Sequence, residues 1–292
     1  MSTASSPVRE LFSGFAGDRI AWFALWVLAA LLLAALAAPW IAPQDPYDLA
    51  QLDILDSKLA PGAASASGTT YWLGTDDQGR DMLSAILHGL RISIGVGIFS
   101  TVIALALGIM IGLSAARAGG WTETLVMRIV DLQLSFPAIL IALVLLALSG
   151  QGVDKIIIAL VVVQWAYYAR TVRGAALVEL RKEYVEAAVC AGYGSARILF
   201  RHVLPNVLPS LSVIATVQVA QAIALEATLS FLGLGLPITE PSLGLLIANG
   251  YVHLLSGKYW ISFFPGIALL ITIVAINLAG DRLRDVLNPR LR

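Results

Sequence analysis

The chain has 292 residues, of which 58% are hydrophobic and only 13% are charged, and its mean hydropathy is +0.83. Soluble domains carry about 25% charged residues, so this composition excludes an ordinary soluble protein and indicates one that spans a membrane. The 19 Lys and Arg residues balance the 19 Asp and Glu residues, so net charge points to no class of partner, and we expect no nucleic acid among the partners. Cys190 is the single cysteine, which excludes a disulfide within the chain.

Six charge-free apolar runs are candidates for transmembrane helices, which need about 20 residues to cross about 30 Å of hydrocarbon. They are residues 20–42, 92–116, 132–150, 156–169, 203–225 and 261–280. The first run is longer than the roughly 7 to 15 apolar residues of a secretory signal, so we expect an uncleaved anchor. The fourth would rise only about 21 Å as a helix, so we expect it to extend into its flanks. Pro205 and Pro209 predict a late start or a kink in the fifth.

The Lys and Arg residues are distributed unevenly between the two sides of these six spans. The side that holds both termini carries 14 of the 19, and the other side carries only Lys58, Arg80, Arg91, Lys155 and Lys258. By the positive-inside rule both termini are predicted to lie in the cytoplasm. The predicted order is a cytoplasmic N-terminus (1–19), a first span (20–42), an extracytoplasmic loop (43–90), a core of five spans (91–280) and a cytoplasmic tail (281–292). The protein is therefore predicted to be all-α and polytopic, with six transmembrane helices.

The loop at about residues 170–205 carries the densest group of charges in the chain and lies between the fourth and fifth spans. Residues 177–191 contain no Gly or Pro and predict a helix, which Gly192 ends in a left-handed conformation. Ser195 is predicted to cap a second short helix, and the loop is predicted to end at Leu204-Pro205.

Small side chains lie on one face of the first loop helix. Tyr184, Ala187, Ala188 and Ala191 recur at the spacing of one helical face. A helix that lies on a lipid surface typically carries bulky Leu, Phe or Trp there. The pattern favours contact with a protein partner over a lipid surface, but it does not name the partner.

The same loop resembles the EAA loop of permease subunits in ATP-binding-cassette importers. The resemblance is carried by Glu186, Ala187, Ala188, Gly192, Leu204 and Pro205. His202 stands where the general motif has Ile, and "RHVLPN" (201–206) is similar to the peptide and nickel permeases, in particular the C-type subunit of dipeptide and oligopeptide importers. Further stretches resemble that branch at residues 72–93, 135–142, 168–174, 226–237 and 277–290, where Asn288 replaces the common Asp.

The resemblance implies a type I importer permease fold and a set of partners. In this family a second permease, here giving a heterodimer, shares the pathway, two cytoplasmic ATPases bind ATP and Mg and accept the EAA loops, and an extracytoplasmic solute-binding protein delivers the cargo. Glu186 and Gly192 would then be coupling residues. The implied cargo is di- or oligopeptides, with nickel or another small solute as the alternative.

Catalytic and metal-binding motifs are absent from the sequence. There is no G-x-x-x-x-G-K-[ST] phosphate-binding loop and no H-E-x-x-H motif, so we expect no cofactor in this chain and no enzyme activity. Its three histidines, at 88, 202 and 253, are too scattered to indicate a metal site. A secondary transporter would usually show internal repeats, and an intramembrane enzyme would show a catalytic motif, so both are weaker hypotheses.

Four other features have two interpretations each. Gly108 and Gly112 form a GxxxG pattern that either packs against another helix or is chance. The acidic outer loop either binds a basic partner or is simply solvated. Within that loop, apolar positions predict an amphipathic helix on the membrane surface or on a partner: Met82, Leu83, Ile86, Leu87 and Leu90. Polar residues of the fifth span either line a translocation pathway or serve helix packing: Gln218, Gln221 and Glu226.

Overall fold

The computed structural model describes residues 18–48, 52–65 and 68–287; most of the predicted N-terminal segment, with Arg9, and the last part of the tail, with Arg290 and Arg292, lie outside them. The described part of the chain is almost entirely helical. Its helices are α2 (Arg19–Ile41), α3 (Met82–Ala118), α4 (Gly120–Ser135), α5 (Ala138–Ser149), α6 (Val153–Glu179), α7 (Glu183–Cys190), α8 (Ser195–Ile198), α9 (Leu204–Phe231), α10 (Leu243–Tyr251) and α11 (Trp260–Leu287). Shorter elements are the 3-10 helices η2 (Ile54–Asp56) and η4 (Leu254–Ser256), the π-helix η3 (Leu199–Val203) and the antiparallel strands β1 (Ala63–Ala64) and β2 (Thr70–Tyr71).

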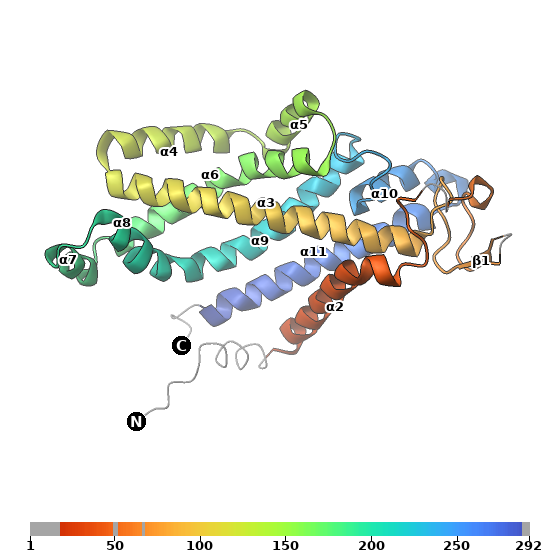
Figure 1. Cartoon of the computed structure of the whole chain (residues 1–292), viewed down its shortest axis with the longest axis horizontal. Helices are drawn as coiled ribbons and strands as arrows, with labels where there is room; N and C mark the ends of the chain where they lie inside the picture. Colours follow the sequence, from red (N-terminus) through yellow and green to blue (C-terminus); the bar gives the residue numbers. More distant parts are fainter. Residues whose placement is uncertain (1–17, 49–51, 66–67, 288–292) are drawn as a thin grey trace.

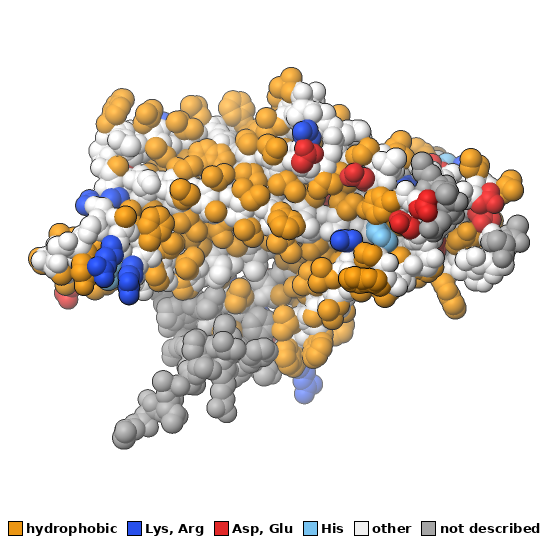
Figure 2. Space-filling view, in the orientation of Figure 1, with side chains coloured by type: hydrophobic (Ala, Val, Ile, Leu, Met, Phe, Trp, Pro, Cys, Tyr) orange, Lys and Arg blue, Asp and Glu red, His pale blue; other side chains and the backbone are white. Residues whose placement is uncertain are grey.

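The long helices run along the longest axis of the molecule (Figure 1). One end of this bundle carries α7 and α8, and the other carries α10 and the loop with β1 and β2. In the face shown in Figure 2, apolar side chains cover the middle, basic ones gather at the α7 end, and acidic ones gather at the opposite end. This distribution is the one expected of a helical bundle set across a membrane.

Five described helices are long and apolar enough to cross a membrane, and a sixth span results if the bent pair α4 and α5 is taken together. The predicted span over residues 132–150 is not one continuous helix, because α4 ends at Ser135 and α5 begins at Ala138 at an angle of 89°. Pro137 is the physical cause, since a residue that precedes proline is driven out of the α region. Phe136 accordingly has φ −93° and ψ 143°.

The short fourth run borrows length from both sides, as expected. Helix α6 runs for 27 residues and includes Arg170 and Arg173, which pair with Asp131 and Glu123 of α4. Helix α6 also packs closely against α3, because a Cβ at Gly108 would lie 2.3 Å from Cβ of Tyr168. The GxxxG pattern is therefore a packing motif, as one of its two interpretations predicted.

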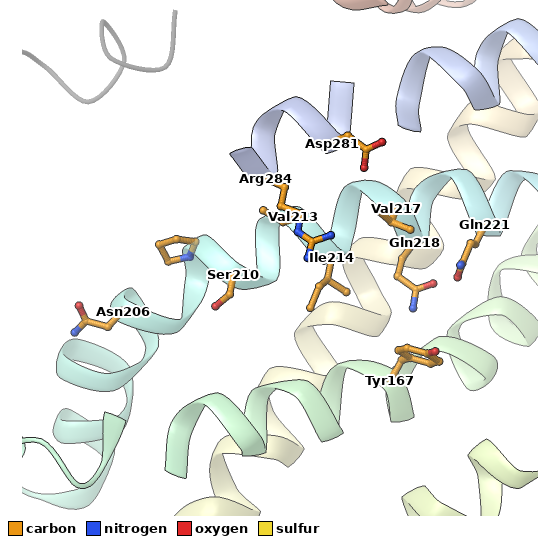
Figure 3. A pocket seen from close by; sticks show the side chains of 11 residues that line it. Tyr167, Asn206, Ser210, Val213, Ile214, Val217, Gln218, Gln221, Asp281 and Arg284 are labelled. Carbon is orange, nitrogen blue, oxygen red and sulfur yellow. The ribbon is translucent and has the colours of Figure 1, made fainter. Parts of the chain in front are cut away.

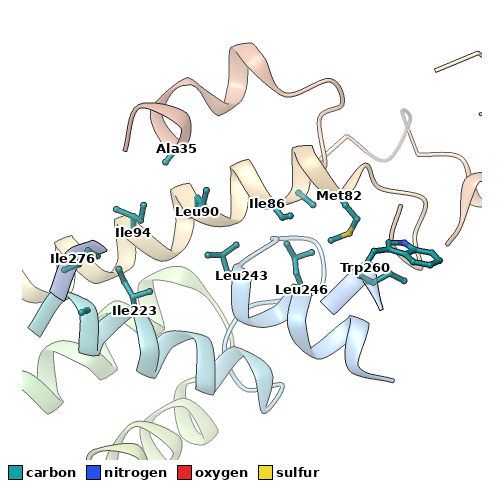
Figure 4. Close-up of a cluster of buried hydrophobic side chains, with 13 residues drawn as sticks. Ala35, Met82, Ile86, Leu90, Ile94, Ile223, Leu243, Leu246, Trp260 and Ile276 are labelled. Carbon is teal, nitrogen blue, oxygen red and sulfur yellow. The ribbon is translucent and has the colours of Figure 1, made fainter. Parts of the chain in front are cut away.

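The amphipathic segment that begins at Met82 does not lie on the membrane surface. It is the first part of α3, which continues unbroken into the second span. Met82, Ile86 and Leu90 belong to a buried cluster formed by α2, α3, α9, α10 and α11 (Figure 4), whereas Leu83 and Leu87 are half-buried. Met82 is 0% exposed and Leu90 is 3% exposed. Asp81 caps the helix by accepting a 2.8 Å hydrogen bond from the amide of Ser84. The acidic loop is thus joined rigidly to the bundle.

The fifth span also begins earlier than predicted. Helix α8, the π-helix η3 and α9 form one helical stretch from Ser195 to Phe231, so Leu204-Pro205 does not end the loop. Proline lacks the amide hydrogen that an α-helix uses, and the π-helix, a form common at functional sites, lies just before Pro205. The Asn206 amide donates a 2.7 Å hydrogen bond to the carbonyl of His202 inside this transition.

Candidate functional site

Helix α7 is a short separate helix at one end of the bundle, not the end of a longer one. The predicted helix over residues 177–191 is broken, because α6 ends at Glu179 and α7 begins at Glu183. The turn between them brings Val185 and Ala188, which are 4% and 5% exposed, into a buried cluster with α3, α6 and α9. No Gly or Pro marks this turn, so propensity gave no signal for it and packing decided it.

The outer face of α7 carries Glu186 and Ala187, which are both exposed. The predicted small face is split, because Ala188 points into the bundle while Tyr184 and Ala191 remain exposed. Val189 adds an apolar side chain that is 56% exposed. A partner that approached α7 would therefore meet a carboxylate, small side chains and one branched apolar group.

Gly192 ends α7 with φ +76°, which confirms the predicted left-handed conformation. Its amide donates to the carbonyl of Val189 at 2.9 Å, and the amide of Tyr193 donates to the carbonyl of Ala188 at 3.1 Å, so the last turn is closed. Ser195 does not cap α8, because its hydroxyl instead accepts a 3.0 Å hydrogen bond from Arg117 of α3. The turn is thereby tied to the end of the second span.

Aromatic contacts hold the same turn against η3. The Tyr193 ring stacks on His202 with centroids 5.7 Å apart and planes 12° apart. The Arg197 guanidinium lies over the Tyr193 ring at 4.3 Å, within the range of a cation–π contact. His202, the departure from the general motif, therefore has a defined packing role.

A hydrogen-bond network centred on Tyr184 joins α7 to the helices on either side of it. The Tyr184 hydroxyl donates to Glu179 of α6 at 2.7 Å and accepts from the Asn206 amide of α9 at 3.2 Å. Burial and the bond to Glu179 raise the pKa of Tyr184 to about 12, so the hydroxyl stays protonated at neutral pH and keeps donating. Lys182 donates to the other Glu179 oxygen at 2.6 Å. These bonds favour movement of α7 as one unit with the ends of α6 and α9.

A groove of about 860 Å³ follows α9 from this network into the bundle (Figure 3). Its lining includes two of the three predicted pathway residues, Gln218 and Gln221. Side chains from α6 and α11 complete it, among them Tyr167, Asp281 and Arg284. Sequence reasoning missed these three, because no spacing in the chain indicates that α6 and α11 meet α9 here.

Residues 108–292 match the family described as binding-protein-dependent transport system inner membrane component, and residues 6–61 match the N-terminal transmembrane domain of oligopeptide transport permease C. The chain is 37% identical to the di/tripeptide transport system permease protein DppC of Pseudomonas aeruginosa, over 98% of this chain and 93% of that protein. It is 34% identical to the glutathione transport system permease protein GsiD of Pectobacterium atrosepticum, over 98% of this chain and 92% of that protein.

The chain belongs to the binding-protein-dependent permease family. It is a multi-pass inner-membrane permease of the peptide/glutathione group of ATP-binding-cassette importers, so partner ATPases and a binding protein are implied, and such subunits are non-catalytic. An inward-facing structure of the MetNI methionine ABC transporter shares the fold, with a TM-score of 0.57 and 23% identity over 70% of this chain and 97% of that one. The expected importer permease fold is confirmed.

Glu226, the third predicted pathway residue, does not line the groove with Gln218 and Gln221. Its carboxyl is fully buried and accepts hydrogen bonds from Ser93 of α3 at 2.8 Å and from Ser230 at 2.7 Å. This geometry fits the packing interpretation better than the pathway one. Within the described residues, no group of three or more His, Cys, Asp or Glu side chains could hold a metal ion.

Proposed function

We propose that this permease pairs with a second permease to form the pathway for small peptides delivered by an extracytoplasmic binding protein, and that α7 couples this pathway to cytoplasmic ATPases. The observation that carries the proposal is the Tyr184 network, which bonds α7 to both α6 and α9. A short helix held at both sides transmits a displacement as a rigid body, whereas a loose loop would absorb it. Glu186, Ala187, Ala188, Gly192, Leu204 and Pro205 form this coupling element.

Closure of the ATPases around ATP and Mg would shift α7, and the hydrogen bonds pass that shift to the start of α9. Because α9 lines the groove, its movement changes which end of the pathway is open. No step of this mechanism requires a catalytic group in the permease. Hydrolysis supplies the free energy in the partner subunits, and the permease converts it into a helix movement.

The orientation we propose places α7 in the cytoplasm. Basic side chains gather at the α7 end in Figure 2, and acidic ones at the opposite end. The start of α2 and the end of α11 point toward the half of the molecule that carries α7 (Figure 1). In this orientation the start of α2 and the end of α11 would lie on the side that receives the ATPases, in accord with the positive-inside rule.

Small peptides are the cargo that the relatives favour. One relative is named for di- and tripeptides and another for glutathione, which is itself a tripeptide. We infer a peptide backbone of two to several residues as the common feature of the cargo.

Uptake by the complete importer in proteoliposomes tests this function. Labelled dipeptide, tripeptide and glutathione are offered with the cognate binding protein, and each component is omitted in turn. We expect peptide uptake that requires ATP, both permeases and the binding protein. Uptake of a nickel chelate in place of peptide, or peptide uptake without the ATPases, would overturn the proposal.

A further inference from the structure

The groove along α9 is lined by one cation, one anion and three side-chain amides, which belong to Asn206, Gln218 and Gln221. We propose that it is a transit site for the peptide itself, in which Arg284 binds the terminal carboxylate, Asp281 binds the terminal ammonium, and Gln218 and Gln221 bind the peptide groups between them. The inference rests on the proposed peptide cargo. It adds a recognition step in the permease to the selection made by the binding protein.

Gln218 gives the first argument for a ligand. The residue is only 5% exposed, yet its amide forms no hydrogen bond with any residue that the structure describes. The amide is not among the buried side-chain atoms that lack a partner, so it faces the open space of the groove, where a ligand can replace water. Figure 3 shows the Gln218 amide directed into the groove. A peptide group, which offers both a donor and an acceptor, would satisfy it.

The two charges on α11 give the second argument. Asp281 and Arg284 lie three residues apart, which places them on the same face of the helix. Both are exposed, and neither forms an ion pair within residues 18–48, 52–65 and 68–287. A zwitterionic peptide has a positive and a negative terminus, which could pair with Asp281 and Arg284 respectively.

The size and the lining of the groove are compatible with a peptide whose side chains are not selected. The groove of about 860 Å³ lies within the 300–1,000 Å³ of ordinary ligand sites. Along α9 it extends from Asn206 to Gln221, about 22 Å at the helical rise. Asp281 and Arg284 lie about one helical turn apart, so a peptide whose two termini reach both is short, a di- or tripeptide, and the groove has room for it. Val213, Ile214 and Val217 add apolar contact that does not select among side chains.

Protection of a cysteine in the groove tests the site directly. The complete importer is purified in detergent with Cys190→Ala and Ser210→Cys in this chain, since Ser210 is exposed and lines the groove. We measure the rate of maleimide labelling of this chain with leucyl-leucine and with its N-acetyl, C-amide analogue. We expect the zwitterionic dipeptide to slow labelling about fivefold and the neutral analogue to leave it unchanged.

Matched variants distinguish loss of the Arg284 charge from a general effect on folding. Arg284→Gln should raise the dipeptide concentration needed for half-maximal protection about tenfold, the size of effect expected when one charged hydrogen-bond partner is lost. Arg284→Lys should retain most of it. Arg282→Gln removes the same charge two residues away, outside the groove lining, and should leave protection intact.

Three outcomes would overturn the transit site. Equal protection by the neutral analogue would show an apolar crevice, protection by glycerophosphate but not by the dipeptide would show a lipid headgroup site, and an unreactive Ser210→Cys would show that the second permease covers the groove. Peptide uptake is measured with the same preparation. Normal uptake without protection would contradict only the proposed transit site. Absence of peptide uptake by the unmodified importer would contradict the proposed function.

Discussion

At Gly192 the permease needs a left-handed backbone, with φ +76°, to turn from α7 into α8. Left-handed residues other than Gly cost about 1–2 kcal/mol, and β-branched ones are the least suited. No atom lies within 4 Å of a Cβ added there, so strain and not collision decides the effect. We predict that Gly192→Val keeps pairing of the two permeases but weakens ATPase attachment and abolishes uptake. Gly192→Asn is the control, because Asn tolerates this conformation. Co-purification of the ATPases and normal uptake for Gly192→Val would refute the prediction.

The Tyr184 hydroxyl of α7 forms hydrogen bonds with both α6 and α9. We predict that Tyr184→Phe leaves the complex assembled but lowers the number of peptides imported per ATP by about threefold, because each lost hydrogen bond is worth about 1 kcal/mol. Tyr193→Phe is matched to it, since the Tyr193 ring keeps its stack on His202 without a hydroxyl. Parallel assays of ATP hydrolysis and uptake measure the ratio. An unchanged ratio in Tyr184→Phe would mean that the network does not transmit movement.

Helices α3 and α6 lie in close contact at Gly108 and Gly112, the two glycines of the GxxxG pattern. A Cβ at Gly108 would meet Tyr168 at 2.3 Å, whereas a Cβ at Gly95 of the same helix would meet nothing within 4 Å. We predict that Gly108→Ala destabilises the permease by about 1–3 kcal/mol through overpacking, while Gly95→Ala is neutral or slightly stabilising. Thermal unfolding of the detergent-purified complex compares the two. Equal melting temperatures would show that the contact between α3 and α6 is loose.

Element by element, hydrophobic runs and charge boundaries predicted most of the spans, because each run must cover the same thickness of hydrocarbon. The failures have physical causes. Residues 132–150 form one charge-free apolar run, yet Pro137 divides that run between the helices α4 and α5. Met82 looked like the start of a surface helix, but the cluster around Trp260 buries it. The sequence of one helix shows which of its faces is apolar, but it does not show which other helices cover that face.

Across the whole molecule, the residues proposed for coupling were chosen from the sequence alone, whereas the groove lining was only half predictable. The EAA resemblance located Glu186 and Gly192 within one continuous stretch of sequence. Gln218 and Gln221 stood out because polar residues are costly in a span. Arg284 did not, since a charge at the end of the last span is usual and only the fold brings α11 beside α9.

Topology is the property of the whole molecule that labelling from the two sides tests. In the Cys190→Ala background we place Ser256→Cys at the end with α10 and Ala196→Cys at the end with α7, both at exposed positions. An impermeant maleimide added to intact cells should label Ser256→Cys alone. Ala196→Cys should react only in inverted vesicles. The reverse pattern would show that the permease has the opposite orientation, with α7 outside the cytoplasm and unable to contact an ATPase.

Contact between α7 and an ATPase is the claim on which the rest depends, and photo-crosslinking measures it most directly. A benzophenone amino acid replaces Ala187, an exposed residue of α7, in cells that produce the complete importer. After illumination, the account predicts one adduct, between this permease and an ATPase subunit, which disappears when the ATPases are not expressed. Crosslinks to lipid alone, with the ATPases present and uptake normal, would show that α7 rests on the membrane surface and would contradict the account.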